Sequence, residues 1–196
     1  SRRLTRVRQG KTPRRSMCYP VSVETGGANF LATVEIAIRR SQAEDAPALA
    51  ALHRDAWRDA YRGIIPGVTL ERMVARRGPR WWRSMHRLGA ATSILEFEGM
   101  PAGYASFGPS RIGSLGAEGE IYELYLKAEY QGAGLGRQLF RAARDELRAE
   151  GMRGLVVRSL AANEAACRFY RGVGGREVGR STERIGDLTL ATLAFH

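Results

Sequence analysis

Three glycines at alternating positions stand directly before a helical pattern, and this stretch limits the fold more than any other. Gly132, Gly134 and Gly136 follow a strand-like segment, and apolar residues then recur at helical spacing from Leu135 to Leu147. Glycine loses more conformational freedom on folding than any other residue, so three of them at a helix start need a reason. We expect a turn between a strand and a helix whose backbone N–H groups can all approach one ligand.

That arrangement predicts an anion site. The first N–H groups of a helix have no partner within the helix, and the helix dipole places positive charge at the same end, which suits a phosphate or pyrophosphate. Arg137 adds a formal positive charge. A tight turn without a ligand stays an alternative on glycine spacing alone. A Walker P-loop is excluded because Arg137-Gln138 stands where Lys-Ser/Thr is required, and the G-x-G-x-G spacing differs from the Rossmann fingerprint.

The net charge of +11 suggests nucleic-acid binding, but the distribution of the charge along the chain argues against such a function. Of the 31 basic residues, seven lie within residues 1–15, where there is no acidic residue, which leaves 24 basic against 20 acidic residues in the rest of the chain. The excess is therefore mostly a property of the N-terminal segment. We expect no nucleic-acid partner for the main domain, and a nucleic-acid-binding arm stays an alternative.

The chain is expected to divide into two parts. Residues 1–33 lack a sustained period and include Pro13, Pro20 and Gly26-Gly27, which predicts a basic, poorly structured N-terminal arm. Residues 34–196 are regular and form the predicted domain. No apolar run approaches the roughly 20 residues of a membrane span, and no secretory signal is visible, so we expect a cytoplasmic protein without a membrane partner. The two cysteines, Cys18 and Cys167, predict neither a disulfide framework nor a zinc site.

The periodicity of residues 34–196 predicts strands surrounding interior helices, and hence a mixed α/β sheet. Strands are expected at residues 34–40, 154–160 and 187–195, within residues 119–130, and on both sides of a turn at Glu98-Gly99 within residues 91–108. Asp45 and Pro47 indicate the start of a first helix by a capping carboxylate and a proline in the first turn. A helical segment from Leu70 to Leu88 is expected to be interrupted near Gly78-Pro79, and further helices follow Gly134 and Asn163.

The glycine stretch also resembles a known family. Residues 131–136, Q-G-A-G-L-G, match the Q/R-x-x-G-x-G/A signature of the GNAT superfamily of N-acetyltransferases. The segments GEIYELYL, NEAACRFY, AWRDAYRGIIP and RIGDLTLATLAF are similar to further segments of the family, so the resemblance runs from about Val34 to the C-terminus. Gly174-Gly175 departs from the usual Gly-Phe pair, which leaves the packing there open. The resemblance implies a GNAT-type fold: a mostly antiparallel central sheet splayed at the coenzyme site, with about four helices.

The resemblance further implies that acetyl-CoA is the co-substrate and that no metal takes part. In the family, two neighbouring strands separate at this point and the pantetheine arm enters the gap. Asn163 is expected either to bind the pantetheine or to cap its helix. The expected coenzyme-binding residues are Leu124, Tyr125 and Leu126 on the strand, Gln131, Gly132, Ala133, Gly134, Leu135, Gly136 and Arg137 in the loop, and Asn163.

Acetyl transfer to an amine needs a neutral amine, stabilisation of the carbonyl oxygen and a proton for the leaving thiolate. By resemblance Tyr170 is the proton donor, since a phenol with a pKa near 10 is protonated at neutral pH. Glu120 is the first candidate for the base and Glu123 the second, and a solvated carboxylate or water alone stays an alternative for that role. His53 and His86 lie in helical stretches and are interpreted as structural or exposed.

The acceptor pocket is expected near Tyr61, Arg62 and Arg111, where two arginines suit a carboxylate or a phosphate on the acceptor. The predicted function is direct transfer of an acetyl group from acetyl-CoA to a primary amine of a small-molecule or peptide acceptor in a ternary complex. A non-catalytic acyl-CoA-binding or sensing protein on the same fold is the main alternative. The sequence leaves open which amine is the acceptor and whether the chain forms a homodimer.

Overall fold

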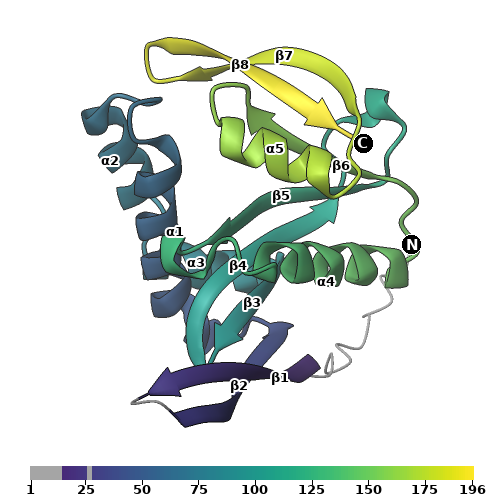
Figure 1. Cartoon of the computed structure of the whole chain (residues 1–196). Helices are drawn as coiled ribbons and strands as arrows, with labels where there is room; N and C mark the ends of the chain where they lie inside the picture. Colours follow the sequence, from purple (N-terminus) through teal and green to yellow (C-terminus); the bar gives the residue numbers. More distant parts are fainter. Residues whose placement is uncertain (1–14, 26–27) are drawn as a thin grey trace.

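A mixed sheet forms the centre of the fold, and helices cover both of its faces (Figure 1). The computed structural model describes residues 15–25 and 28–196. The strands are β1 (Arg15–Thr25), β2 (Ala28–Arg40), β3 (Ala91–Phe97), β4 (Met100–Pro109), β5 (Gly119–Leu126), β6 (Leu155–Leu160), β7 (Glu177–Ile185) and β8 (Leu188–Phe195). The α-helices are α1 (Ala46–Tyr61), α2 (Gly67–Ala75), α3 (Pro79–Arg87), α4 (Leu135–Ala149) and α5 (Glu164–Gly172). Short 3-10 helices lie at Ala43–Asp45, Gly113–Leu115 and Ala128–Tyr130.

The sheet order is β1-β2-β3-β4-β5-β6-β8-β7, and each neighbouring pair is antiparallel except β5 and β6, which are parallel. This confirms the expected mixed, mostly antiparallel sheet. The described residues form five α-helices, where about four were expected. The segment from Leu70 to Leu88 counts as two of them, α2 and α3, because it is interrupted at Gly78-Pro79 as predicted. None of the α-helices in these residues is long and apolar enough to cross a bilayer.

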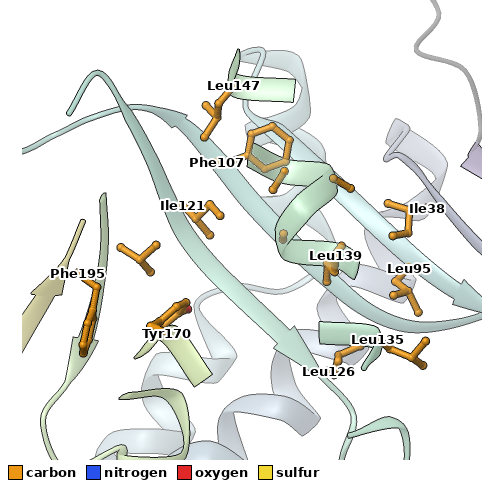
Figure 2. Packing of buried hydrophobic residues seen from close by; sticks show 14 of the residues in the cluster. Ile38, Leu95, Phe107, Ile121, Leu126, Leu135, Leu139, Leu147, Tyr170 and Phe195 are labelled. Atoms are coloured by element: carbon orange, nitrogen blue, oxygen red, sulfur yellow. The ribbon is translucent and has the colours of Figure 1, made fainter. Parts of the chain in front are cut away.

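On β3 and β4, neighbouring side chains point to opposite faces of the sheet and belong to two different cores. On β3, Leu95 joins the core beneath α4 and α5, and Ile94 joins the core beneath α1 and α3. The same division holds on β4 for Ala105 and Tyr104. Figure 2 shows the first core, where α4 and α5 cover the sheet. Helices α1, α2 and α3 lie on the other side of the sheet (Figure 1).

The N-terminal segment departs from expectation. Residues 15–25 and 28–33, expected to be poorly structured, belong to strands β1 and β2, which pair from Arg15 opposite Ile38 to Thr25 opposite Ala28. A Gly-Gly pair between two extended runs is a hairpin signal, and Pro20 is tolerated because β1 is an edge strand. Residues 1–14, which carry the nucleic-acid-binding alternative, lie outside the described residues. The domain boundary at residue 34 stays a prediction.

Asp45 begins α1 in a different way from the one predicted. It occupies the N-cap position, but its carboxylate makes no capping bond to α1. Instead it accepts hydrogen bonds from the Arg39 guanidinium at 2.7 and 2.8 Å and from the backbone N–H of Gln42 at 2.7 Å. Pro47 lies in the first turn as expected. The carboxylate therefore links the start of α1 to Arg39 on β2.

Candidate active site

Strands β5 and β6 separate shortly after they begin. Their parallel ladder has three pairs, from Gly119 opposite Leu155 to Ile121 opposite Val157. Beyond Ile121, β5 stays paired with β4 and β6 pairs with β8, from Val157 opposite Phe195 to Leu160 opposite Thr192. The edge of β5 that faces β6 is consequently unpaired at residues 122–126, which include the predicted Leu124, Tyr125 and Leu126. This is the expected splay of the sheet.

A β-bulge in β5 lies at the same place. The register with β4 shifts between Ser106 opposite Glu123 and Phe107 opposite Ile121, so Tyr122 is the extra residue. The shift lets residues on both sides of it face the same way: Glu120, Tyr122, Glu123 and Tyr125 all line one cavity. The side chains of Ile121, Leu124 and Leu126 pack instead in the core beneath α4 and α5. Bulges that re-aim side chains are common beside active sites.

The glycine loop lies between β5 and α4 with its backbone donors available. No described residue accepts a hydrogen bond from the backbone N–H groups of residues 132–137. Residues 131–134 are exposed, and α4 begins at Leu135. Consecutive free N–H groups at a helix start form an anion-binding site. This geometry is consistent with the expectation that the backbone N–H groups of the loop can approach one ligand.

Glycine is needed at the three positions for two different structural reasons. Gly132 and Gly134 have φ of 82° and 79°, a left-handed conformation that side chains disfavour, and a Cβ at either would meet open space. Gly136 has no such φ, but a Cβ there would lie 3.3 Å from both Leu126 and Phe169. The first two glycines therefore shape the turn, and the third lets α4 approach β5 and α5.

The other predicted coenzyme residues contribute in different ways. The Gln131 side chain donates to the carbonyl of Leu126 at 3.0 Å, and Arg137 donates to the carbonyl of Gly172 at the end of α5 at 3.1 Å. Both brace the loop against its neighbours. The side chain of Leu135 is buried in the core, so only its backbone faces the loop, whereas Ala133 is exposed. Asn163 caps α5, its side-chain oxygen accepting from the N–H of Ala166 at 3.1 Å.

A cavity of about 410 Å³ lies beside the gap, on the face of the sheet that α1, α2 and α3 cover. Aromatic and apolar side chains form much of its wall, and six charged side chains enter it. The aromatic residues are Trp57, Tyr61, Trp81, Trp82, Tyr122 and Tyr125. The charged residues are Arg77, Arg111, Arg158, Glu120, Glu123 and Glu183. A volume of this order holds a small molecule.

Glu123 lies in a buried network. Its carboxylate is ion-paired with Arg77 and accepts a hydrogen bond of 3.1 Å from the hydroxyl of Tyr104. The Tyr104 oxygen lies 2.9 Å from Nδ1 of His53. A phenol has one proton, so if Tyr104 donates to Glu123 then Nδ1 of His53 carries a proton and donates to Tyr104. Burial raises the pKa of Glu123 above its usual value, although the charge and hydrogen bond of Arg77 oppose this.

Glu120 is held differently. It is fully buried and accepts from the Arg111 side chain at 2.7 and 3.2 Å and from the Arg111 backbone N–H at 2.8 Å. Burial alone favours the neutral acid, but the hydrogen bonds and charge of Arg111, with the charge of Arg158, lower the pKa of Glu120 below its usual value. A carboxylate stabilised in this way is a weak base. The pKa directions make Glu123 the stronger base of the two, whereas the sequence places Glu120 first; which of them serves as the base stays a prediction.

Tyr170 lies on the other side of β5 from Glu123. Its ring is buried 5.7 Å from that of Phe195, and burial raises the pKa of its phenol well above the usual value, so the hydroxyl keeps its proton. Gly175 explains the departure noted in the sequence. A Cβ there would lie 2.9 Å from the Tyr170 carbonyl, to which the Gly175 N–H also donates, so no larger residue fits.

Of the expected acceptor residues, the structure brings two to the cavity. The Tyr61 hydroxyl shares a hydrogen bond of 2.7 Å with that of Tyr125, and Arg111 lies 4.1 Å from the Tyr122 ring centre. Arg62 does not line the cavity: its side chain is 80% exposed and lies 4.0 Å from Asp59. It follows the last residue of α1 and turns outward.

His53 is fully buried against Trp57, in agreement with its interpretation as structural, and burial and the charge of Arg77 lower its pKa to about 3. Arg77 and Arg158 line the cavity but are not among the site residues expected from sequence. Arg77 comes from the α2–α3 connection, and its guanidinium lies 5.3 and 4.8 Å from the Trp57 and Trp81 ring centres. Arg158 had a signal in the sequence, because it is a lone charge in the apolar strand run GLVVRSL. Within the described chain, no three His, Cys, Asp or Glu side chains are grouped as metal ligands.

Comparison with known proteins agrees with this geometry. Residues 47–174 match the model of the acetyltransferase (GNAT) family. The chain is 30% identical over 155 residues to an uncharacterized N-acetyltransferase, YuaI, of Bacillus subtilis, covering 79% of this chain and 88% of that protein.

Solved structures share the fold. The PaiA N-acetyltransferase of Thermoplasma acidophilum, in complex with coenzyme A, superposes with a TM-score of 0.63 at 17% identity, over 80% of this chain and 97% of that one. YncA of Salmonella typhimurium, a putative acetyltransferase with its cofactor acetyl-CoA, superposes with a TM-score of 0.58 at 23% identity, over 82% and 91% of the two chains.

Proposed function

The chain belongs to the acetyltransferase (GNAT) family, and from this premise we propose that it transfers an acetyl group from acetyl-CoA directly to a primary amine. The observation that carries the proposal is the unpaired edge of β5 at residues 122–126. It has the glycine loop of α4 on one side and the cavity on the other. A thioester in the gap between β5 and β6 therefore meets a pyrophosphate site and an acceptor chamber from opposite faces.

The loop residues take the diphosphate through their backbone. The free N–H groups of residues 132–137 donate to phosphate oxygens, and the dipole of α4 adds to the attraction. Gln131 and Arg137 keep the loop in place through their bonds to β5 and α5. Since Asn163 uses its side-chain oxygen to cap α5, its amide nitrogen is the group left to contact the pantetheine.

Backbone groups of β5 position the acetyl carbon. The N–H of Leu124 or of Leu126, which faces the unpaired edge because that of Tyr125 faces β4, donates to the carbonyl oxygen as that oxygen becomes negative. This contribution needs no side chain. The N–H is available for the carbonyl oxygen because the separation of β5 and β6 leaves it without a partner.

Glu123 and Tyr170 move the protons. Glu123 takes a proton from the ammonium of the acceptor, because its raised pKa makes it a better base than an exposed carboxylate. The free amine then forms the C–N bond as the C–S bond breaks, and the nitrogen releases a second proton to solvent. Tyr170 donates its phenol proton to the departing thiolate and regains one from solvent. The products are the N-acetyl amine and coenzyme A with a free thiol.

Two measurements test the proposal together. Calorimetry with acetyl-CoA is expected to give a 1:1 complex, and release of free thiol is expected with at least one member of a panel of primary amines. Absence of binding at millimolar acetyl-CoA contradicts the proposed site. Binding without thiol release for any amine points to a non-catalytic acyl-CoA-binding protein instead.

A further inference from the structure

Arg158 enters the cavity from β6 without a hydrogen-bond partner of its own. Its Nε atom lies 3.7 Å from Oε1 of Glu120, beyond hydrogen-bonding distance, and its side chain is 34% exposed. No hydrogen bond joins its guanidinium to any residue in the described part of the chain. A guanidinium has five N–H donors in a planar fork, so this one presents unused donors to the chamber.

Positive charge exceeds negative charge at the end of the cavity where Arg111 and Arg158 lie. Arg111 and Arg158 both approach Glu120, which is the one carboxylate within 4.0 Å of either among the described residues. Arg111 takes up the hydrogen-bonding capacity of Glu120 through its side chain and its backbone N–H. One positive charge therefore remains at Arg158, since Glu183, the other acidic residue of the wall besides Glu123, forms no ion pair with it. A carboxylate or phosphate that bonds a guanidinium through two oxygens fits this charge and this geometry.

The strand register sets the offset between Arg158 and the proposed base along the strand direction. Val157 lies opposite Ile121, so Arg158 lies at the level of Tyr122, one residue before Glu123 along the strand direction. One residue along a strand is about 3.3 Å. In an α-amino acid a single carbon separates the amino group from the carboxylate. An acceptor of this kind can place its carboxylate towards Arg158 while its amine lies near Glu123.

The remaining wall suits an uncharged side chain. Trp57, Tyr61 and Trp82 face the chamber, together with Met73 and Met85. Such a wall gives apolar contact, and the volume of about 410 Å³ holds a small molecule.

We propose that the acceptor is a free α-amino acid with an apolar or aromatic side chain, whose carboxylate is bound by Arg158 at the rim formed with Arg111. This proposal rests on the proposed function, since it names the acceptor of that site. Arg158 is a specificity-determining residue: it selects the acceptor by its carboxylate and positions the amine for Glu123.

The test compares acceptors that differ at one group. Thiol release is measured with L-phenylalanine, L-phenylalaninamide, phenethylamine and the aminophosphonate analogue of phenylalanine, and the series is repeated for methionine and leucine. The free amino acid is expected to have a kcat/KM about 10- to 100-fold above its amide and its decarboxylated amine, as for a hydrogen-bonded charge pair. A preference for the aminophosphonate overturns the carboxylate assignment in favour of a phosphate-bearing acceptor.

The matched variants are Arg158→Gln, Arg158→Lys and, as a control outside the cavity, Arg62→Gln. Arg158→Gln is expected to bring the ratio of amino acid to amine kcat/KM close to one, mainly by raising KM for the amino acid. Arg158→Lys is expected to restore part of the ratio, because it returns the charge without the fork. Arg62→Gln is expected to keep the wild-type ratio.

The outcomes separate the two proposals. If acetyl-CoA does not bind, the proposed function fails. If acetyl-CoA binds and amines react as fast as amino acids, or if no amino acid in the series reacts, the acceptor assignment is wrong. An equal loss of kcat for every acceptor in Arg158→Gln also overturns it, because Arg158 then acts on the reaction and not on selection. If that variant does not bind acetyl-CoA, the wild-type comparison of amino acid with amide and amine decides.

Discussion

The hydroxyl of Tyr104 donates a hydrogen bond of 3.1 Å to the carboxylate of Glu123. The two residues come from neighbouring strands, β4 and β5, at the point where the bulge turns Glu123 towards the cavity. Because Arg77 also holds this carboxylate, it is fixed in direction while burial raises its pKa. The carboxylate of Glu123 therefore combines a fixed direction with a raised pKa.

Glu123→Gln removes the proposed base and keeps the size of the side chain. We expect kcat to fall by about 100- to 10,000-fold at neutral pH, the usual contribution of a general base. Acetyl-CoA binding by calorimetry is expected to stay within a few-fold of wild type. Glu164→Gln, an exposed change on α5, is the control. A kcat equal to that of the control removes Glu123 from the mechanism.

Tyr104→Phe tests how Glu123 is tuned. The hydrogen bond from Tyr104 favours the ionised form and lowers the pKa of Glu123, so its loss raises that pKa further. Activity needs ionised Glu123 and therefore rises with pH through its pKa. We expect the acidic limb of the kcat/KM profile to move to higher pH in the variant. A limb at the wild-type position shows that another group controls it.

His53 makes stability depend on pH. Burial lowers its pKa to about 3, whereas an unfolded histidine has a pKa near 6.5, so below pH 6.5 the unfolded chain binds a proton that the native protein does not. The free energy of unfolding is thus expected to fall by up to about 1.4 kcal/mol per pH unit from pH 6.5 towards 3. Urea unfolding at pH 7.5 and 5.5 measures it. In His53→Gln this part of the decrease is expected to vanish; an unchanged decrease contradicts the assignment.

Gly134→Ala tests whether the glycine loop binds acetyl-CoA, apart from the cost in stability of an alanine at positive φ. Gly134 has φ of 79° and Gly151, just beyond α4 at its other end, has φ of 84°, and a Cβ at either meets nothing within 4 Å. Alanine at each position is expected to cost about 1 kcal/mol of unfolding free energy. Only Gly134→Ala is expected to weaken acetyl-CoA binding, by about 10-fold or more, since it displaces amides at the diphosphate site. Equal affinities in the two variants argue against that site.

Tyr170→Phe keeps the ring that packs against Phe195 and removes the phenol proton. We expect acetyl-CoA affinity to be retained and kcat to fall about 100-fold, the low end of what a general acid contributes. The measurement is thiol release under saturating substrates. If the rate does not change, solvent supplies the proton and Tyr170 is a packing residue.

Some features could be predicted from sequence because their causes are local. The period of two or 3.6 residues marks strands and helices, and the breaks at Gly78-Pro79 and in the glycine loop follow from backbone conformation at those residues. The family signature lies within six consecutive residues and places the coenzyme loop before α4. The pairing of β1 with β2 differs from the expectation, because Pro13, Pro20 and Gly26-Gly27 are signs of irregular structure in the sequence alone.

The choice of the proposed base and of the proposed acceptor chamber required the tertiary structure. Glu120 and Glu123 stand in one short strand, and nothing local to them tells which is neutralised by Arg111 and which is buried against Tyr104 and Arg77. The pKa of a carboxylate depends on burial and on charges within a few ångströms, and here these come from β4, β6, the β4–β5 connection and the α2–α3 connection. Local propensity thus determined the elements and the loop, and contacts between distant segments decided which side chains meet at the gap.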